Sequence, residues 1–231
     1  MNETVFSRFY AIVVAPRAAM EAVRAEPRWT AAALAIVLMV AVLAAATVPI
    51  AGPEQLDMMQ ETSLGRHLPP EEIEQAYAQF EDMGLKDRLM SGLQAGFSVL
   101  VSLLIMSLVY LLFGRLAGGR GTFQQILGVL FWANVVGIGL GSLVKLPLVL
   151  ATGSSLRVSL GPALLMADRG PLDPMFQLLS FFDVFSLWAV ALVVLGHEAV
   201  HGFARSKAAA VAGGAWLLMV SVMFGVARLV S

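Results

Sequence analysis

The sequence predicts an all-α, polytopic membrane protein with five transmembrane helices, an N-terminal interfacial helix and a helical external loop. Composition is the first observation behind this class: 58% of the 231 residues are hydrophobic and only 13% are charged. Soluble domains are nearer to about 45–50% apolar and about 25% charged. A soluble chain of this size has too small a core to bury the excess, so many apolar residues are expected to face lipid.

The second observation is that the apolar residues form five long stretches, each near the roughly 20 residues that cross a hydrocarbon core. The predicted spans are 29–50, 93–116, 123–150, 176–196 and 208–227. The first is expected to end at the helix breakers Gly52 and Pro53. Because it exceeds the roughly 7–15 apolar residues of a signal peptide, it is interpreted as a retained span. Residues 29–231 are therefore the predicted membrane domain.

The segment 1–28 before the first span is predicted to lie at the cytoplasmic membrane interface. Phe6, Phe9 and Tyr10 are apolar, and Pro16 with Arg17 begins a second piece. Arginine beside aromatic residues suits an anionic leaflet.

Short loops rich in Lys and Arg stay in the cytoplasm, so the basic residues predict the orientation. The predicted cytoplasmic set is Arg8, Arg17, Arg24, Arg28, Arg115, Arg120, Arg205 and Lys207. The opposite side holds fewer, and most lie in long loops: Arg66, Lys86, Arg88, Arg157, Arg169 and Arg228. The N-terminus is therefore predicted in the cytoplasm and the C-terminus on the external side of the membrane.

Residues 51–92 form the predicted external loop, which is acidic. Pro69 and Pro70 followed by acidic residues predict the start of a helix, and Gly84 predicts its end. Ile73, Tyr77 and Phe80 share one face of it. The helix is expected to lie on the spans or on the lipid surface, with a partner-binding helix as the alternative.

Small residues recur at every fourth position in two spans, which lets helix backbones approach closely in lipid. They are Ala133, Gly137 and Gly141 in the third span, and Ala209–Gly213 and Ala210–Gly214 in the fifth. Packing within one monomer and a homo- or hetero-oligomer interface are both open. Thr122 and Gln125 predict a capping box that starts the third span.

Two ionisable residues lie within the predicted spans, where charges are costly and usually paired or functional. Lys145 near the end of the third span and Asp183 in the fourth are predicted at a similar depth. We expect them to pair, either as a structural clasp or as part of a polar site. Asn134 is expected to form a hydrogen bond between helices.

His197, Glu198 and His201 spell H-E-x-x-H, the pattern in which two helical histidines hold zinc and the glutamate activates a water. A catalytic zinc normally has three protein ligands. Asp183 is about 21 Å away along the helix. His67 and Asp173 are predicted on the other side of the membrane. The remaining candidates for a third zinc ligand are therefore Glu3, Glu21 and Glu26. The favoured interpretation is a polar helix end without a cofactor; a metal site and a protease are the alternatives.

Several strings, in order along the chain, resemble the Yip (Ypt/Rab-interacting protein) domain family in its bacterial branch. They are Ala-Pro-Arg-Ala-Ala-Met at 15–20, Glu26-Pro27, Gly-Thr-Phe-Gln-Gln at 121–125, Asp-Val-Phe-Ser-Leu-Trp at 183–188, and the stretch 196–208. The resemblance implies five spans with a cytoplasmic N-terminus. Eukaryotic relatives look like trafficking factors that associate with small GTPases, through a long N-terminal region that is reduced here to 1–28. The resemblance carries over no catalytic residue, and family members often have other residues at 197 and 201.

The predicted function is therefore a non-enzymatic membrane protein that organises the lipid bilayer or partner proteins through helix packing. A small transporter or channel that uses Lys145 and Asp183 is the second hypothesis, and a zinc protein is the third. No basic run predicts binding to nucleic acid.

Overall fold

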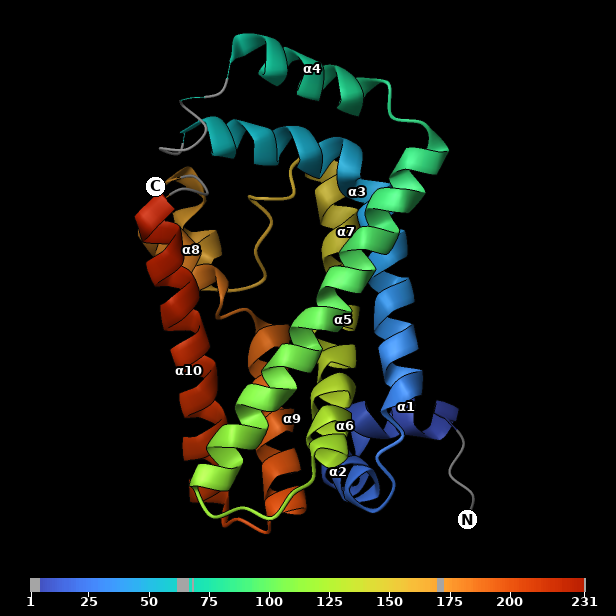
Figure 1. The fold of residues 1–231 in the computed structure, drawn as a ribbon, viewed down its shortest axis with the longest axis vertical. Helices are drawn as coiled ribbons and strands as arrows, with labels where there is room; N and C mark the ends of the chain where they lie inside the picture. Colours follow the sequence, from blue (N-terminus) through green and yellow to red (C-terminus); the bar gives the residue numbers. More distant parts are fainter. Residues whose placement is uncertain (1–4, 62–66, 68, 170–172, 231) are drawn as a thin grey trace. The chain divides into compact units, whose positions relative to one another are not determined.

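A computed structural model describes residues 5–61, 67, 69–169 and 173–230, and every regular element in these ranges is helical (Figure 1). The elements are α1 (Val5–Val14), α2 (Pro16–Ala25), α3 (Trp29–Glu61), α4 (Pro70–Glu81), α5 (Leu85–Leu116), α6 (Phe123–Asn134), the π-helix η2 (Val135–Leu140), α7 (Gly141–Thr152), the 3-10 helix η3 (Pro162–Arg169), α8 (Pro174–Ser180), α9 (Val184–His201) and α10 (Arg205–Val230). Glu3 and Arg66 lie outside the described residues.

Five stretches of the described chain are long and apolar enough to cross a membrane. They are Trp29–Glu61, Leu85–Leu116, Phe123–Thr152, Val184–His201 and Arg205–Val226. The predicted fold class, an all-α protein with five spans, is confirmed. The third stretch combines α6, η2 and α7.

The chain forms two compact units. Unit 1 comprises Met1–Met39, Gly96–Gly141 and Phe185–Met219, and unit 2 comprises Val40–Ala95, Ser142–Val184 and Val220–Ser231. Long helices such as α3 and α5 contribute residues to both units.

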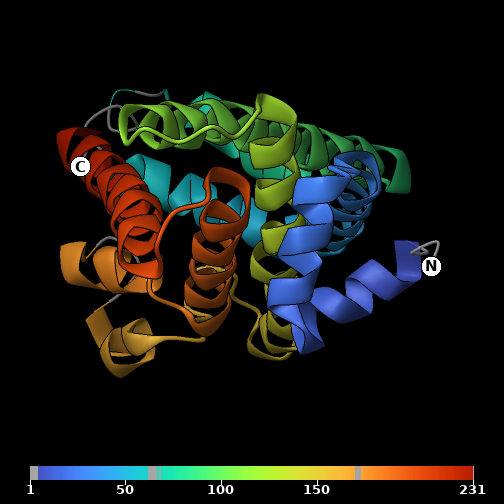
Figure 2. The ribbon, with the colours of Figure 1, turned by 90° about the horizontal axis from the view of Figure 1, so that it is seen from below.

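Helix α6 is the centre of unit 1. Residues 126–133 are all buried, so this helix is covered on every side. The α6 helix lies between α9 and α2, as Figure 2 shows. Two glycines permit these contacts: a Cβ on Gly196 of α9 would overlap the Val129 side chain, and one on Gly128 would lie 2.9 Å from Val23 of α2.

The N-terminal helices α1 and α2 meet at an angle (Figure 2) and pack on α6. Phe9 of α1 contacts Trp132 edge to face, with ring centroids 5.0 Å apart. The Trp132 indole donates to the Arg28 carbonyl at 3.1 Å. Phe6 and Tyr10 stay exposed on the outer face of α1. An apolar outer face fits the predicted interfacial position.

The predicted start of the third span is confirmed, because Thr122 and Gln125 form a reciprocal capping box. The small residues that follow are used within the unit. A Cβ on Gly137 would lie 2.8 Å from Ala189, and one on Gly141 would lie 3.2 Å from Phe185. Both neighbours belong to α9.

Helix α3 continues past Gly52 and Pro53 to Glu61, so the predicted end of the first span is wrong. The proline sites bend the helix instead of ending it, as the cyan part of α3 in Figure 1 shows. Contacts with α4 stabilise the turns of α3 that follow Pro53. Phe80 packs directly on Gly52, and the Tyr77 hydroxyl donates to Asp57 and accepts from Gln60 at 2.8 Å.

Helix α4 begins at Pro70, as the sequence predicts, and ends at Glu81, before the predicted stop at Gly84. Ile73, Tyr77 and Phe80 are its half-buried side, and they include both side chains that contact α3. The hydrogen bond to Asp57 raises the pKa of Tyr77. This helix therefore lies against the end of a span, which is the favoured prediction.

The predicted fourth span, 176–196, is wrong as a single helix. Its first part is α8, and the chain leaves helical structure between Phe181 and Asp183 before α9 begins. Gly161 causes a close approach at this break, because its absent side chain lets the loop pass the backbone of Asp183. A Cβ there would lie 2.8 Å from the Phe182 carbonyl oxygen. Asp183 therefore precedes α9 rather than lying inside it.

Candidate functional site

The H-E-x-x-H string occupies the last turn and a half of α9 in unit 1. His197 and His201 share one face, with ring centroids 5.2 Å apart. His197 is fully buried, and His201 is 7% exposed. The helical spacing predicts this shared face, but a polar helix end at the interface was expected, whereas both rings are buried in the interior of the unit.

The His201 ring lies in a pocket of glycines that belong to the end of α5 and the α5–α6 turn. A Cβ on Gly114, Gly119 or Gly121 would overlap the imidazole. Phe203 covers the ring by stacking, with centroids 5.0 Å apart. The sequence analysis did not predict that these glycines make space for the His201 ring.

Hydrogen bonds define the tautomer of each histidine. Nδ1 of His197 lies 2.9 Å from the Val193 carbonyl, which can only accept, so Nδ1 carries the hydrogen and Nε2 carries a lone pair. The Gly121 N–H donates to Nδ1 of His201 at 3.0 Å, so the neutral His201 ring carries its hydrogen on Nε2. Both Nε2 atoms are buried and have no hydrogen-bond partner among the described protein atoms.

This pattern does not fit a zinc ion held by the two Nε2 atoms. A histidine ligand must offer a lone pair, and the other ring nitrogen normally donates to a carbonyl or carboxylate. His197 meets both conditions, but His201 meets neither. Among the described residues, no three His, Asp or Glu side chains are grouped closely enough to hold a metal ion.

Glu198 points away from the histidines and is held by two arginines. Its two carboxylate oxygens accept from Arg17 of α2 and Arg205 of α10, each at 2.8 Å. Two charged partners stabilise the ionised form and restrain the side chain. Glu198 is thus committed to joining three helices of unit 1, a contact that sequence reasoning missed.

Two of the other acids considered as zinc ligands, Glu21 and Glu26, are also paired with arginines. Glu21 pairs with Arg24 at 3.1 Å, and Glu26 pairs with Arg28 at 2.8 Å. Arg8 is 5% exposed and donates to the Glu26 carbonyl at 2.8 Å. Arg8 was predicted only as an interfacial charge; here it secures α1 to the chain that enters α3.

In unit 2, the structure brings Lys145 and Asp183 together. Nζ of Lys145 in α7 lies 3.3 Å from Oδ2 of Asp183, the residue before α9. The Asp183 side chain is 7% exposed and that of Lys145 is 34% exposed. Lys145 also lines a cavity of about 220 Å³ beside α3, with Thr47 and Ser142 as its other polar residues.

Asn134 differs from its prediction. Its side-chain amide donates to the Leu130 carbonyl of its own helix at 2.8 Å, where a bond between helices was expected. It is the last residue of α6 before the π-helix. The amide therefore bonds locally at the point where the helical hydrogen-bond pattern changes.

A model of the Yip1 domain family matches residues 10–226. The match includes α2 through α9 and reaches the last turns of α10. Comparisons with curated proteins and with solved structures gave no match.

The tautomers predict that the untagged protein purifies without stoichiometric zinc. His201 would have to exchange the Gly121 bond for a metal bond, so zinc occupancy is expected to stay low when zinc is added in equimolar amount. Elemental analysis of the wild type and of His197→Ala, with the exposed His67→Ala as control, measures this. One zinc per chain that is lost only in the α9 variant contradicts the expectation.

The ion pair in unit 2 predicts a clear energetic coupling. Lys145→Met removes one charged partner of the buried Asp183 carboxylate and is expected to cost about 2–3 kcal/mol, less than a fully buried pair because Lys145 is 34% exposed. The double variant with Asp183→Asn should cost less than the sum of the single variants, with a coupling of about 1 kcal/mol or more. Unfolding in mild detergent measures these costs, and Lys86→Met, at an exposed base, is the control. Additive costs contradict a clasp.

Proposed function

Because the chain belongs to the Yip1 domain family, we propose that it is a non-enzymatic membrane protein that organises lipid and partner helices through packing. We further propose that the chain belongs to the bacterial branch of the family and resides in the inner membrane. Residues 29–231 then form one membrane domain. No cofactor and no nucleic acid take part.

The observation that carries this proposal is the free small-residue face of α10. Ala209, Ala210 and Gly214 are exposed, and a Cβ on Gly213 or Gly214 would meet nothing within 4 Å. The third span uses its small residues against α9, whereas α10 leaves these available. Close backbone approach at such a face drives association of helices in lipid. A second copy of this chain, or a related chain, is the partner that we propose.

The commitment of the candidate catalytic groups supports a non-enzymatic role. Glu198 is fixed by Arg17 and Arg205, and His201 uses Nδ1 to accept from Gly121. A general base must instead be free to reach a proton on a substrate or water. Reassigning Glu198 would break two ion pairs first.

A small transporter or channel is the second candidate, because Lys145 lines a cavity in unit 2. The cavity is small, and its other lining residues are mostly apolar. Lys145 is also bonded to Asp183, so a transported ion would compete with an existing partner. Packing therefore remains the favoured function.

The charge of unit 1 supports a cytoplasmic N-terminus. Among its residues, Lys and Arg outnumber Asp and Glu by eight to four: Arg8, Arg17, Arg24, Arg28, Arg115, Arg120, Arg205 and Lys207, against Glu3, Glu21, Glu26 and Glu198. Unit 2 has the opposite balance and includes the acidic α4 segment. We propose that the α5–α6 and α9–α10 connections face the cytoplasm and that α4 is external.

Gly214→Leu is expected to shift the protein from oligomer to monomer, because the added side chain prevents close approach on α10. Single-molecule photobleaching in lipid bilayers should show an association weakened by about tenfold or more. The control is Ala46→Leu, which places the same leucine side chain on an exposed face of α3. Association should not respond to chelators. An unchanged oligomer, or a wild type that is monomeric and retains no partner, contradicts the proposal.

The orientation is testable in intact cells, since the chain has no cysteine. A membrane-impermeant maleimide should label Glu74→Cys in α4 without permeabilisation, and Ser206→Cys in α10 only after permeabilisation. Both positions are exposed, so access across the membrane decides the result. The reverse labelling pattern rejects the proposed orientation.

A further inference from the structure

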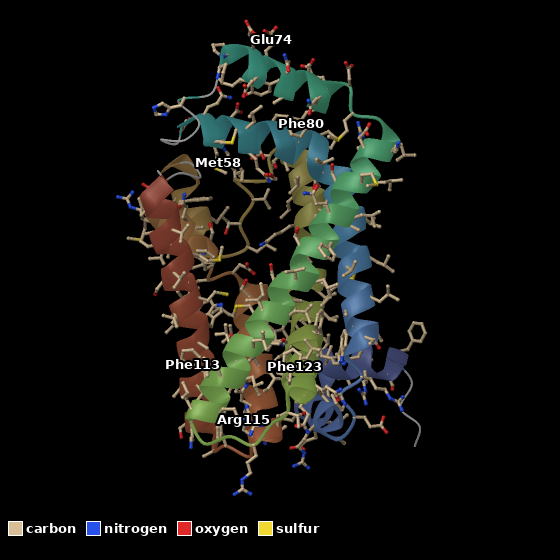
Figure 3. The ribbon with its side chains drawn as sticks, in the orientation of Figure 1. Met58, Glu74, Phe80, Phe113, Arg115 and Phe123 are labelled. Atoms are coloured by element: carbon tan, nitrogen blue, oxygen red, sulfur yellow. The ribbon has the colours of Figure 1, made fainter. Side chains whose placement is uncertain are left out.

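Unit 2 contains a pocket of about 400 Å³ that none of the sites above uses. It is bounded by α8, by the last turns of α10, by the loop after α7 and by Met58 of α3. Met58 is labelled in Figure 3, on the part of α3 that follows the bend. All of these residues belong to the same compact unit.

One wall of the pocket is held in place by Glu54 of α3. A single carboxylate oxygen accepts from the Ser155 N–H and the Ser155 hydroxyl, each at 2.6 Å, and from the Leu156 N–H at 3.3 Å. Ser155 and Leu156 line the pocket. Hydrogen bonds to a charged acceptor are strong, so this loop is fixed to α3 before any ligand arrives.

The lining is mostly hydrocarbon and aromatic. Much of it comes from Phe176 of α8, Phe181 directly after α8, Phe224 of α10 and two methionines, Met58 and Met223. Methionine side chains adapt to the shape of a flexible apolar ligand. A hydrated or charged ligand would lose its solvation here without compensation.

The pocket opens on the surface of α10 that faces lipid. Met223 lines the pocket and is 53% exposed, and its neighbours Val222 and Val226 on the same helix are 56% and 55% exposed. Apolar residues this exposed on a membrane-spanning helix contact acyl chains. The pocket is therefore continuous with the interface between the protein and the bilayer, where acyl chains are the most abundant apolar ligand.

One polar group in the lining is available to a ligand. Gln177 of α8 is half-buried beside Phe176, and its amide makes no hydrogen bond to the described residues. An amide offers both donors and an acceptor. It matches the ester carbonyl at the polar end of a phospholipid chain.

We propose that this pocket binds one acyl chain of a membrane phospholipid, with the Gln177 amide donating to the ester carbonyl. The chain lies among the phenylalanine and methionine side chains. Lipid binding in this pocket requires only that the protein is inserted in a membrane, and it does not require association through α10. The lipid-binding proposal and the oligomer proposal can therefore fail independently.

The test is photolabelling of the full chain in nanodiscs, with a phosphatidylethanolamine that carries a diazirine in the middle of one acyl chain. Peptide mapping should concentrate adducts on residues 155–158, 174–181 and 223–224. Ser180→Trp fills the pocket from α8 and should reduce these adducts about tenfold, because methylene burial is lost. Met58→Trp fills it from α3, so the result does not depend on one variant.

Val222→Trp is the matched control, since it adds the same ring on α10 outside the pocket lining. Gln177→Leu should weaken lipid retention about fivefold in native mass spectrometry, through loss of one hydrogen bond. Circular dichroism and elution volume verify that each variant is folded.

Two outcomes overturn the proposal. One is an even spread of adducts over the lipid-facing helices, which indicates only bulk solvation by lipid. The other is labelling of the pocket that both filling variants leave unchanged. The fraction of oligomer, measured on the same samples, should be the same in both pocket-filling variants as in the wild type.

Discussion

The complete burial of residues 126–133 of α6 is the constraint on which unit 1 depends. A helix with no face left for lipid needs neighbours on every side, and their backbones must come close. Gly196 and Gly128 permit this approach for α9 and α2. The Trp132 N–H must also find an acceptor, because an unpaired polar group in apolar surroundings is costly, and the Arg28 carbonyl supplies it. The N-terminal helices are therefore part of the packing around α6 rather than a loose tail.

The same requirement explains the histidines. His201 enters the packed region because three glycines leave space for its ring and because Gly121 supplies a donor to Nδ1. That donor holds the hydrogen of the ring on Nε2, which removes the lone pair a metal would need there. A sequence pattern associated with zinc chemistry is thus used here to join α9 to the α5–α6 turn. The helical spacing of the motif is real, but the chemistry depends on what the other ring nitrogen contacts.

Local signals predicted much of this fold, whereas contacts between distant residues decided the rest. Span number followed from the length of apolar stretches, and the capping box and the start of α4 followed from a few neighbouring residues. The run of α3 past Gly52 depends on Phe80 of α4, and the break before α9 depends on Gly161. The Glu198–Arg17 pair joins residues 181 positions apart, so no local pattern could indicate it.

The distribution of committed and available groups favours contact with membrane components over catalysis. The ionised groups that were candidates for a functional site form ion pairs: Asp183 with Lys145, and Glu198 with two arginines. The Nε2 atoms of the histidines have no hydrogen-bond partner in the described part of the chain, but burial separates them from any substrate outside. What the described residues offer to other molecules is a small-residue face on α10 and an apolar pocket with one amide. Helices and acyl chains are the ligands that such surfaces recognise, since both bind by close apolar contact with few hydrogen bonds. These surfaces therefore support the proposal that the protein acts by arranging its neighbours in the bilayer, while the polar residues described above hold its own helices in place.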